Sequence, residues 1–215
     1  MFDTVVRFFQ EGGVFMYPIG IVLMIGLAIA LERYIYLSRA KGANRMAFDR
    51  GILPLLQKKE YKSALKYSNQ SGTAIAAVMG AGVSRLLNQQ SREDIEYAME
   101  EGLMETLPRL EKRTQYLATL ANISTLLGLL GTIIGLIAAF TAVANADPAE
   151  KANLLSQSIS VAMNTTAFGL MSAIPLLLFH AVLQTKTNEI VDSFEMAGIK
   201  FLNIISEQNT DLQTK

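Results

Sequence analysis

Residues 114–146 read TQYLATLANISTLLGLLGTIIGLIAAFTAVANA and contain no Asp, Glu, Lys or Arg over 33 positions. A helix needs roughly 20 apolar residues to cross the hydrocarbon core of a bilayer. Helices of soluble proteins ordinarily carry a charged face, and this segment has none. The segment therefore predicts a membrane-spanning helix, which we place at residues 116–144.

Two further segments, 12–31 and 152–185, also lack all four charged residue types. They predict spans at 14–34 and 158–184, and the alternative is a soluble protein with three long core helices. The first segment is too long for the apolar region of a signal peptide and runs into Glu32 and Arg33 instead of a small-residue cleavage site. The predicted fold class is an all-α integral membrane protein with three transmembrane helices.

Composition excludes several other functions. The 215 residues are 51% hydrophobic and 18% charged, with a formal net charge of zero. These values exclude a disordered chain and a basic nucleic-acid binder. With no Cys and one His, we expect no disulfide scaffold, no metal site, no cofactor and no catalytic triad, hence no enzyme.

Lysine and arginine are distributed unevenly between the loops. Fourteen lie in 32–113 and three in 186–215, against one each in 1–13 and 145–157. Because basic residues accumulate on the cytoplasmic side, we expect a cytoplasmic helical domain at 35–115 and a cytoplasmic C-terminal helix or tail at 185–215. Residues 1–13 and 145–157 then lie outside.

Local signals subdivide the cytoplasmic domain. We expect a helix from Pro54 to Asn69 that ends near Gly72, then a buried helix over 73–87. Ser91 followed by Asp94 is typical of a capping box that begins another helix. We expect that helix to continue, bent at Pro108, into the second span.

A row of acidic residues follows that helix start, with i,i+4 spacing and a basic residue at its end: Glu96, Glu100, Glu101, Glu105 and Arg109. We favour a solvated helix face with ordinary ion pairs. An acidic patch at the mouth of a cation path is the alternative.

Small and hydroxyl side chains form one stripe in each of the last two spans. The second span carries Thr125, Gly128, Gly131, Thr132 and Gly135, and the third carries Ser158, Ala162, Thr165, Gly169 and Ser172, with Thr166 beside them and Pro175 beyond. Helix packing explains the glycines and alanines. For Thr132 and Thr166, packing and the lining of an ion path both remain open.

No charged residue lies in the middle of any span. A proton-coupled machine needs a titratable group at membrane depth, and threonine does not titrate in the accessible pH range. If the protein conducts protons, a second polypeptide must supply the carboxylate. Glu32 and Arg33 lie at the inner end of the first span. We expect them to form an ion pair at the membrane interface, with their charged groups reaching toward water (snorkelling).

Three blocks of sequence resemble one known family. Leu126–Gly135 (LLGLLGTIIG) followed by Phe140 is similar to the second span of the MotA/TolQ/ExbB proton channel family. Thr165–Leu170 (TTAFGL) followed by Ala173, Ile174 and Pro175 resembles the third span of its ExbB/TolQ branch. Met16–Ile19 through Arg33 resembles the first span.

The resemblance implies a bacterial inner-membrane subunit that assembles as a homo-oligomeric ring, typically a pentamer, around single-span partners of the ExbD/TolR type. The partner brings a protonatable Asp, beside which Thr132 and Thr166 line the path. Proton flow then drives work on periplasmic or outer-membrane partners, among them proteins of the TonB/TolA type. The outer side of the topology is then the periplasm.

One position departs from the family pattern, because several members have Glu where this chain has Val161. Thr165 adds a hydroxyl beside Thr166, so Na⁺ stays an alternative coupling ion to H⁺. A motility-related stator and a non-conducting membrane scaffold also stay open, whereas three unequal spans disfavour a solute transporter built from inverted repeats. The sequence does not fix which process is energised.

Overall fold

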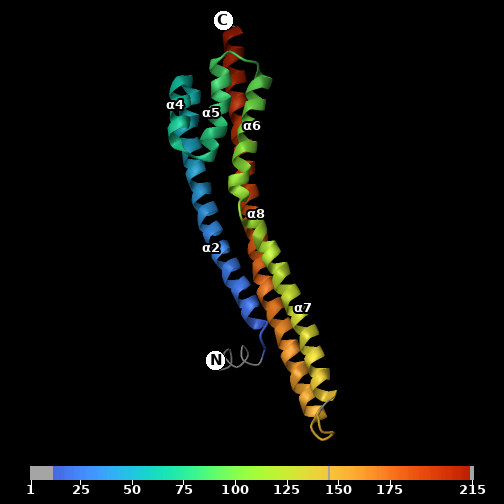
Figure 1. The fold of residues 1–215 in the computed structure, drawn as a ribbon. Coiled ribbons are helices and arrows are strands. Elements are labelled where there is room, and N and C mark those ends of the chain that lie inside the picture. Colours follow the sequence, from blue (N-terminus) through green and yellow to red (C-terminus); the bar gives the residue numbers. More distant parts are fainter. Residues whose placement is uncertain (1–11, 145, 214–215) are drawn as a thin grey trace. The chain divides into compact units, whose positions relative to one another are not determined.

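A computed structural model describes residues 12–144 and 146–213, with side chains through Glu207, and its regular elements are all helical (Figure 1). Three stretches, Met16–Gln57, Arg92–Ala144 and Lys151–Glu207, contain helices long and apolar enough to cross a membrane, which confirms the three predicted apolar helices. In chain order the elements are α2 (Met16–Met46), the π-helical η1 (Ala47–Ile52), α3 (Leu53–Gln57), α4 (Tyr61–Ser71), α5 (Ala74–Leu87), α6 (Arg92–Glu111), α7 (Thr114–Ala144) and α8 (Lys151–Gln213).

The chain divides into two compact units, and unit 1 comprises Met1–Arg33 and Arg113–Val182. Its described part holds the first half of α2, all of α7 and the first half of α8. Side chains from all three helices meet in an apolar core, which consists of Met16, Ile19 and Phe168 with Leu23 and Leu127 packed against them. Unit 1 therefore contains the three apolar helices as one packed bundle.

Large apolar side chains cover the outside of unit 1. They are exposed along every helix, for example Met24 and Leu31 on α2, Leu126, Ile133 and Phe140 on α7, and Met171, Ile174 and Leu178 on α8. A soluble monomer rarely exposes so continuous an apolar surface. In a bilayer the same surface is favourable, because lipid tails are as apolar as these side chains.

Unit 2 comprises Tyr34–Lys112 and Leu183–Lys215, and α5 lies at its centre against α4 and α6. Half of α5 is buried, from Ile75 to Val83, which confirms the predicted buried helix. Gly72 ends α4 in the left-handed conformation, as its sequence position predicts. The amide of Ile75 donates to the side-chain oxygen of Asn44 at 3.0 Å, so α2 caps the start of α5.

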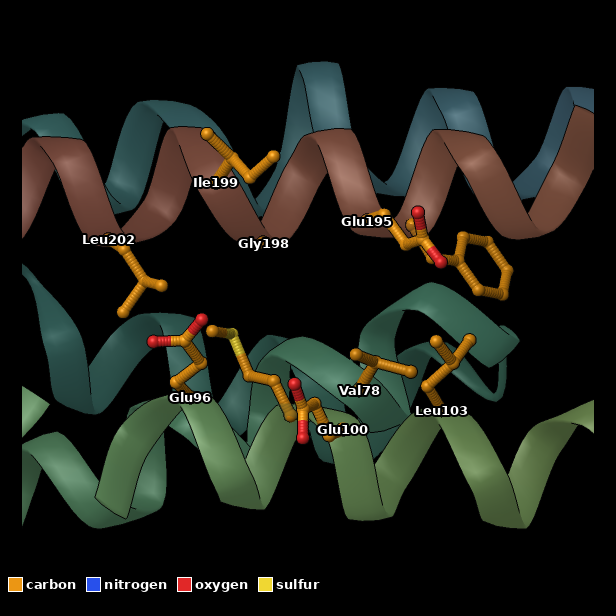
Figure 2. Close-up of a pocket in the computed structure, with 10 residues that line it drawn as sticks. Val78, Glu96, Glu100, Leu103, Glu195, Gly198, Ile199 and Leu202 are labelled. Carbon is orange, nitrogen blue, oxygen red and sulfur yellow. The ribbon is translucent and has the colours of Figure 1, made fainter. Parts of the chain in front are cut away.

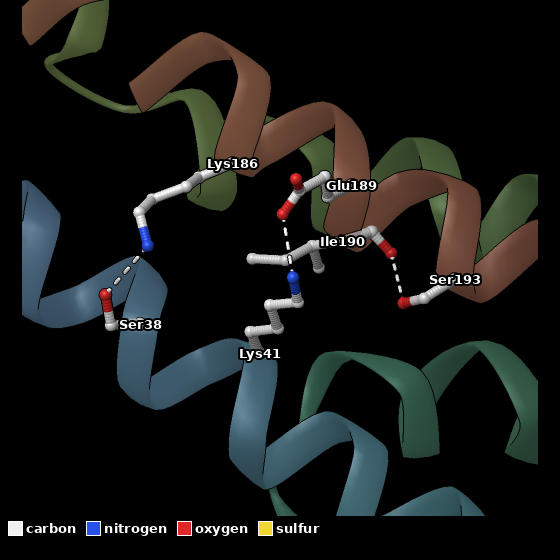
Figure 3. Close-up of polar contacts among 6 residues, drawn as sticks. All are labelled: Ser38, Lys41, Lys186, Glu189, Ile190 and Ser193. Atoms are coloured by element: carbon white, nitrogen blue, oxygen red, sulfur yellow. Dashed lines mark hydrogen bonds and ion pairs between the residues drawn. The ribbon is translucent and has the colours of Figure 1, made fainter. Parts of the chain in front are cut away.

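Polar contacts join α2 to α8 within unit 2 (Figure 3). Lys41 Nζ lies 2.7 Å from Glu189 Oε2, and Lys186 Nζ donates to Ser38 Oγ at 3.3 Å. The hydrogen bond and charge of Lys41 hold the pKa of Glu189 below its ordinary value. Lys186 Nζ also lies 4.5 Å from the centre of the Tyr34 ring, a cation–π geometry.

Two expectations about helix continuity are wrong. The helix that begins at Ser91 does not continue into the second span, because α6 ends at Glu111 and Arg113 adopts a left-handed backbone with φ of 65°. Pro108 lies inside α6 and does not end it. The expected helix from Pro54 to Asn69 is likewise divided, at Lys59 with φ of 61°.

The predicted helix start at Ser91 is confirmed. The Ser91 hydroxyl accepts from the amide of Asp94 at 3.1 Å, and the Asp94 carboxylate accepts from the amide of Ser91 at 3.1 Å. Each side chain therefore satisfies a backbone donor that the helix itself leaves unpaired. The hydrogen bonds from Ser91 lower the pKa of Asp94.

Candidate functional site

The small-residue stripes of α7 and α8 face each other in unit 1. A Cβ added at Gly169 would lie 2.7 Å from the carbonyl oxygen of Ser124 and 3.0 Å from Cα of Gly128. One at Gly135 would lie 2.9 Å from Cβ of Ala162. The helix backbones therefore come into close contact at these positions, as small residues allow between membrane helices.

Thr166 lies where the backbones of the two helices come close to each other. Its hydroxyl is half-buried and donates to the carbonyl oxygen of Gly128 at 2.8 Å. A Cβ at Gly128 would lie 3.2 Å from Cα of Thr166, so only glycine lets the two backbones come this near. The hydroxyl keeps its lone pairs, with which it can accept a further hydrogen bond.

Thr165, the neighbouring hydroxyl, is buried with 2% of its surface exposed. It donates to the carbonyl oxygens of Gly12 at 2.6 Å and Val161 at 3.0 Å. The first bond ties α8 to the segment that precedes α2. Its methyl group packs against Gly131, where an added Cβ would collide with it. These contacts give Thr165 a packing role within unit 1.

Thr132 and Thr125 are half-buried and bond within their own helix. Thr132 donates to the carbonyl oxygen of Leu129 at 2.6 Å, and Thr125 donates to that of Ala121 at 3.2 Å. Thr132 lies one turn beyond Gly128, on the face that Thr166 approaches. The structure thus places Thr166 in the interface of α7 and α8, whereas the hydrogen bond of Thr132 is exposed and stays within α7; each hydroxyl donates to a backbone carbonyl oxygen.

Two serines add buried hydroxyls to the same interface. Ser172 is fully buried, as is Ser124, which the stripe predicted from the sequence did not include. Neither hydroxyl has a hydrogen-bond partner among the described atoms. Gly131 packs against Thr165. Ser124 lies seven residues before Gly131, and Ser172 lies seven residues after Thr165. Because α7 and α8 run antiparallel, the two serines lie at the same level of the interface. The spacing of four residues between Ser124 and Gly128 is the sequence feature that could have predicted the place of Ser124 in this interface.

Pro175 lies within α8, which continues through it, and is half-buried. Because proline has no amide hydrogen, one carbonyl oxygen of the preceding turn loses its helical donor. Leu176 follows it, and its side chain occupies the place that a Cβ at Gly26 on α2 would take. Proline and glycine here fit α8 closely against α2.

Glu32 and Arg33 differ in environment from the exposed pair that their sequence position predicts. The carboxylate of Glu32 accepts from Arg113 Nη1 at 3.1 Å, which joins the middle of α2 to the residue before α7. Arg33 does not snorkel, because only 3% of its surface is exposed. The expectation of a solvent-facing guanidinium is therefore wrong, since tertiary packing encloses this side chain.

The chemistry available in these helices is that of hydroxyls and carbonyls. The segments 114–146 and 152–185 hold no carboxylate. Among the described residues no group of three or more His, Cys, Asp or Glu side chains could hold a metal ion. Hydroxyls can pass or solvate a proton but cannot store one, because they do not titrate in the accessible range.

Comparisons with known proteins identify the family of this chain. Residues 70–196 match the model of the MotA/TolQ/ExbB proton channel family. An ExbB homolog of Methanothermobacter thermautotrophicus, named for biopolymer transport, is 27% identical over 98% of this chain and 76% of its own length. The biopolymer transport protein exbB1 of Vibrio cholerae is 31% identical over 77% of this chain and 73% of its own length. The Tol-Pal system protein TolQ of Haemophilus influenzae is 32% identical over 52% and 48%. The chain belongs to the MotA/TolQ/ExbB proton channel family, in its ExbB/TolQ branch, and is a multi-pass membrane protein.

Proposed function

We propose that this chain is the ion-path subunit of an inner-membrane motor that couples the proton-motive force to work on periplasmic or outer-membrane partners. The observation that carries the proposal is the combination of closely packed hydroxyl-bearing helices with a complete lack of carboxylates in the segments 114–146 and 152–185. A proton path of this kind needs a titratable group at membrane depth. That group comes from an ExbD/TolR-like single-span partner with a membrane Asp.

The proposed path runs along Thr132 and Thr166. Each hydroxyl donates its own proton to a backbone carbonyl, so its oxygen is left to accept from a protonated carboxyl group of the partner. Both side chains are half-buried, which leaves part of each accessible from outside the single chain. Thr165 supports the path by fixing the position of α8, because its hydroxyl proton is shared between two carbonyl oxygens.

The assembly we propose is a homo-oligomeric ring, a pentamer, that encloses the partner spans. The exposed apolar rows of α7 and α8 supply surface for neighbouring copies and lipid. The Lys and Arg distribution supports a periplasmic N-terminus at 1–13, a periplasmic connection at 145–157 and cytoplasmic placement of 35–115 and 185–215. Native mass spectrometry of the purified complex counts the copies, and labelling of single cysteines in this cysteine-free chain tests the topology.

The test of the path compares three alanine variants. Thr132→Ala and Thr166→Ala should each weaken energy transduction and proton flux into vesicles while the complex still assembles. Thr119→Ala is the matched control, because Thr119 is exposed and donates to Gln115 of its own helix at 3.4 Å. Wild-type flux in both path variants would exclude these hydroxyls from the path. Assembly with no flux in the wild type would instead support a non-conducting scaffold.

The coupling ion is tested in the same vesicles. We propose H⁺, because Thr165, whose hydroxyl could have added an oxygen ligand for Na⁺, is buried with 2% of its surface exposed. Flux should therefore follow a pH gradient and be insensitive to a sodium gradient. Flux that requires Na⁺ would favour the sodium-driven alternative.

A further inference from the structure

A groove lies between α6 and α8 in unit 2, far from the hydroxyl stripes in the sequence. Its volume is about 150 Å³, and its floor is apolar, made by Val78, Met99, Leu103, Phe194, Ile199 and Leu202. Three carboxylates line its two sides, Glu96 and Glu100 from α6 and Glu195 from α8 (Figure 2). No Lys, Arg or His is among the described residues that line it, so its lining combines an apolar floor with three negatively charged side chains.

Gly198 keeps the groove open. It lies on the α8 side of the groove between Glu195 and Ile199, and a Cβ there would meet only Cε of Met99, at 3.8 Å. Glycine within a helix costs about 0.5–1 kcal/mol relative to alanine. The groove therefore contains a glycine that close packing inside the chain does not require, in contrast to Gly128 and Gly169.

Other large apolar side chains are exposed on α6 and α8, the two helices between which the groove lies. Tyr97 and Met104, seven residues apart on α6, are 67% and 72% exposed, and Met196 on α8 is 55% exposed. In the proposed topology this surface lies in the cytoplasm, where lipid does not cover it. An exposed apolar patch with a charged rim is typical of an interaction site.

The charges select among possible occupants. Three glutamates disfavour the headgroup of an anionic lipid, and the described residues include no carboxylate cluster with the geometry of a metal site. A short segment that carries one or two aliphatic side chains together with Lys or Arg would fill the floor and neutralise the rim. Such complementarity sets orientation and partner choice at interfaces.

We propose that this groove binds the basic cytoplasmic tail of the single-span partner. A partner with one span and a periplasmic domain has only a short cytoplasmic segment, and basic residues accumulate on that side of a membrane. The tail would bring positive charge and apolar residues from the membrane edge to Glu96, Glu100 and Glu195. The inference rests on the proposed function, because it requires the partner and the cytoplasmic location of unit 2.

A single cysteine in this cysteine-free chain tests the contact. Glu100→Cys, labelled with a benzophenone maleimide and co-expressed with the single-span partner, should cross-link on illumination to the partner segment that precedes its span. Lys62→Cys on α4, exposed and outside the groove, is the control and should give no such product. Mass spectrometry of the cross-linked peptide identifies the occupant. A product only with a second copy of this chain, or only with lipid, would overturn the proposal.

Filling the groove gives a second, independent readout. Gly198→Leu in the labelled Glu100→Cys chain should reduce the cross-link about tenfold, since the new side chain occupies the space of the tail. Gly42→Leu is the matched control, because a Cβ at Gly42 meets nothing within 4 Å, and it should leave the cross-link unchanged. Unchanged yield in the Gly198→Leu chain would refute the groove as the binding site.

The role of the three glutamates that line the groove is tested by removing their charge and by varying the salt concentration. Glu96→Gln with Glu195→Gln should lower the cross-link yield about threefold at low ionic strength, and the difference should shrink in high salt. Glu93→Gln, on the first turn of α6 and outside the groove, should not change it. Co-purification of the partner with every variant separates the proposed function from the proposed binding of the partner's tail in the groove. If the partner does not co-purify even with the wild type, the proposed function fails. If it co-purifies but never reaches the groove, only this inference fails.

Discussion

Replacing Gly169 by alanine is expected to separate α7 from α8 in unit 1. The new methyl carbon would lie 2.7 Å from the carbonyl oxygen of Ser124 and 3.0 Å from Cα of Gly128. Both obstacles are backbone atoms, so no side-chain rotation can relieve the contact. The helices must move apart by about 0.7 Å to restore an ordinary van der Waals distance. A gap of that size removes about a quarter to a half of the dispersion energy of each neighbouring atom contact between the two helices.

The same displacement weakens the hydrogen bond from Thr166 to Gly128. At 2.8 Å this bond is near its optimum, and the added separation takes it past the range of a good hydrogen bond. Overpacking of this kind costs about 1–3 kcal/mol, and a hydrogen bond between membrane helices contributes about 0.6 kcal/mol. Alanine gains up to about 1 kcal/mol in helix propensity. The net destabilisation should be about 1–2 kcal/mol.

Gly42→Ala is the matched control in α2. Because a Cβ at Gly42 meets nothing within 4 Å, it should gain the propensity term alone, about 0.5–1 kcal/mol. Reversible unfolding of the full chain in mixed micelles, followed by helix content as SDS is added, measures both variants. If Gly169→Ala is as stable as Gly42→Ala, the helices are not in backbone contact at this position and the packing argument is refuted.

Three further perturbations test other features. Thr166→Val keeps the side-chain size and removes the hydroxyl bonded to Gly128, so proton flux should fall about tenfold or more while the complex still assembles. Thr166→Ser keeps the hydroxyl and should still conduct. Normal proton flux in the valine variant would exclude this hydroxyl from the proton path. Ser124→Ala and Ser172→Ala each remove a buried hydroxyl that has no partner among the described atoms. Each variant should therefore change the free energy of unfolding by less than about 1 kcal/mol. A larger loss of stability in the SDS titration would reveal an ordered water bound to that hydroxyl. Asp94→Ala should lower the thermal midpoint at neutral pH. Because the pKa of Asp94 is depressed in the folded state, this difference should be full above its ordinary value of 3.8 and vanish as the pH falls through the lower folded value; a pH-independent difference would contradict the capping box.

Much of the architecture is encoded in local sequence. Charge-free segments of 20 to 34 residues predict spanning helices, because a helix is the structure that satisfies its own backbone hydrogen bonds in lipid. Gly72 and the Ser91–Asp94 pair predict helix ends, because each acts within one turn of the backbone. Periodicity likewise predicts which face of α7 and α8 carries the small residues.

The helix breaks were harder to predict. Pro108 is a strong local signal, yet α6 continues through it and ends at Glu111. The turn that follows places Arg113 where it can reach Glu32, 81 residues earlier. No local preference of Lys112 or Arg113 indicates this turn, since both residues are compatible with a helix.

The three apolar helices, the stripes of small residues and the lack of a carboxylate in the later spans can all be read from the order of the residues. Tertiary packing sets the rest: Thr165 bonds to Gly12 while its neighbour Thr166 bonds to Gly128, Arg33 is buried, and Glu96, Glu100 and Glu195 line one groove. The physical reason is that successive residues of a helix point about 100° apart. Periodicity gives the face of a side chain, and only the register and rotation of the packed helices give its partner.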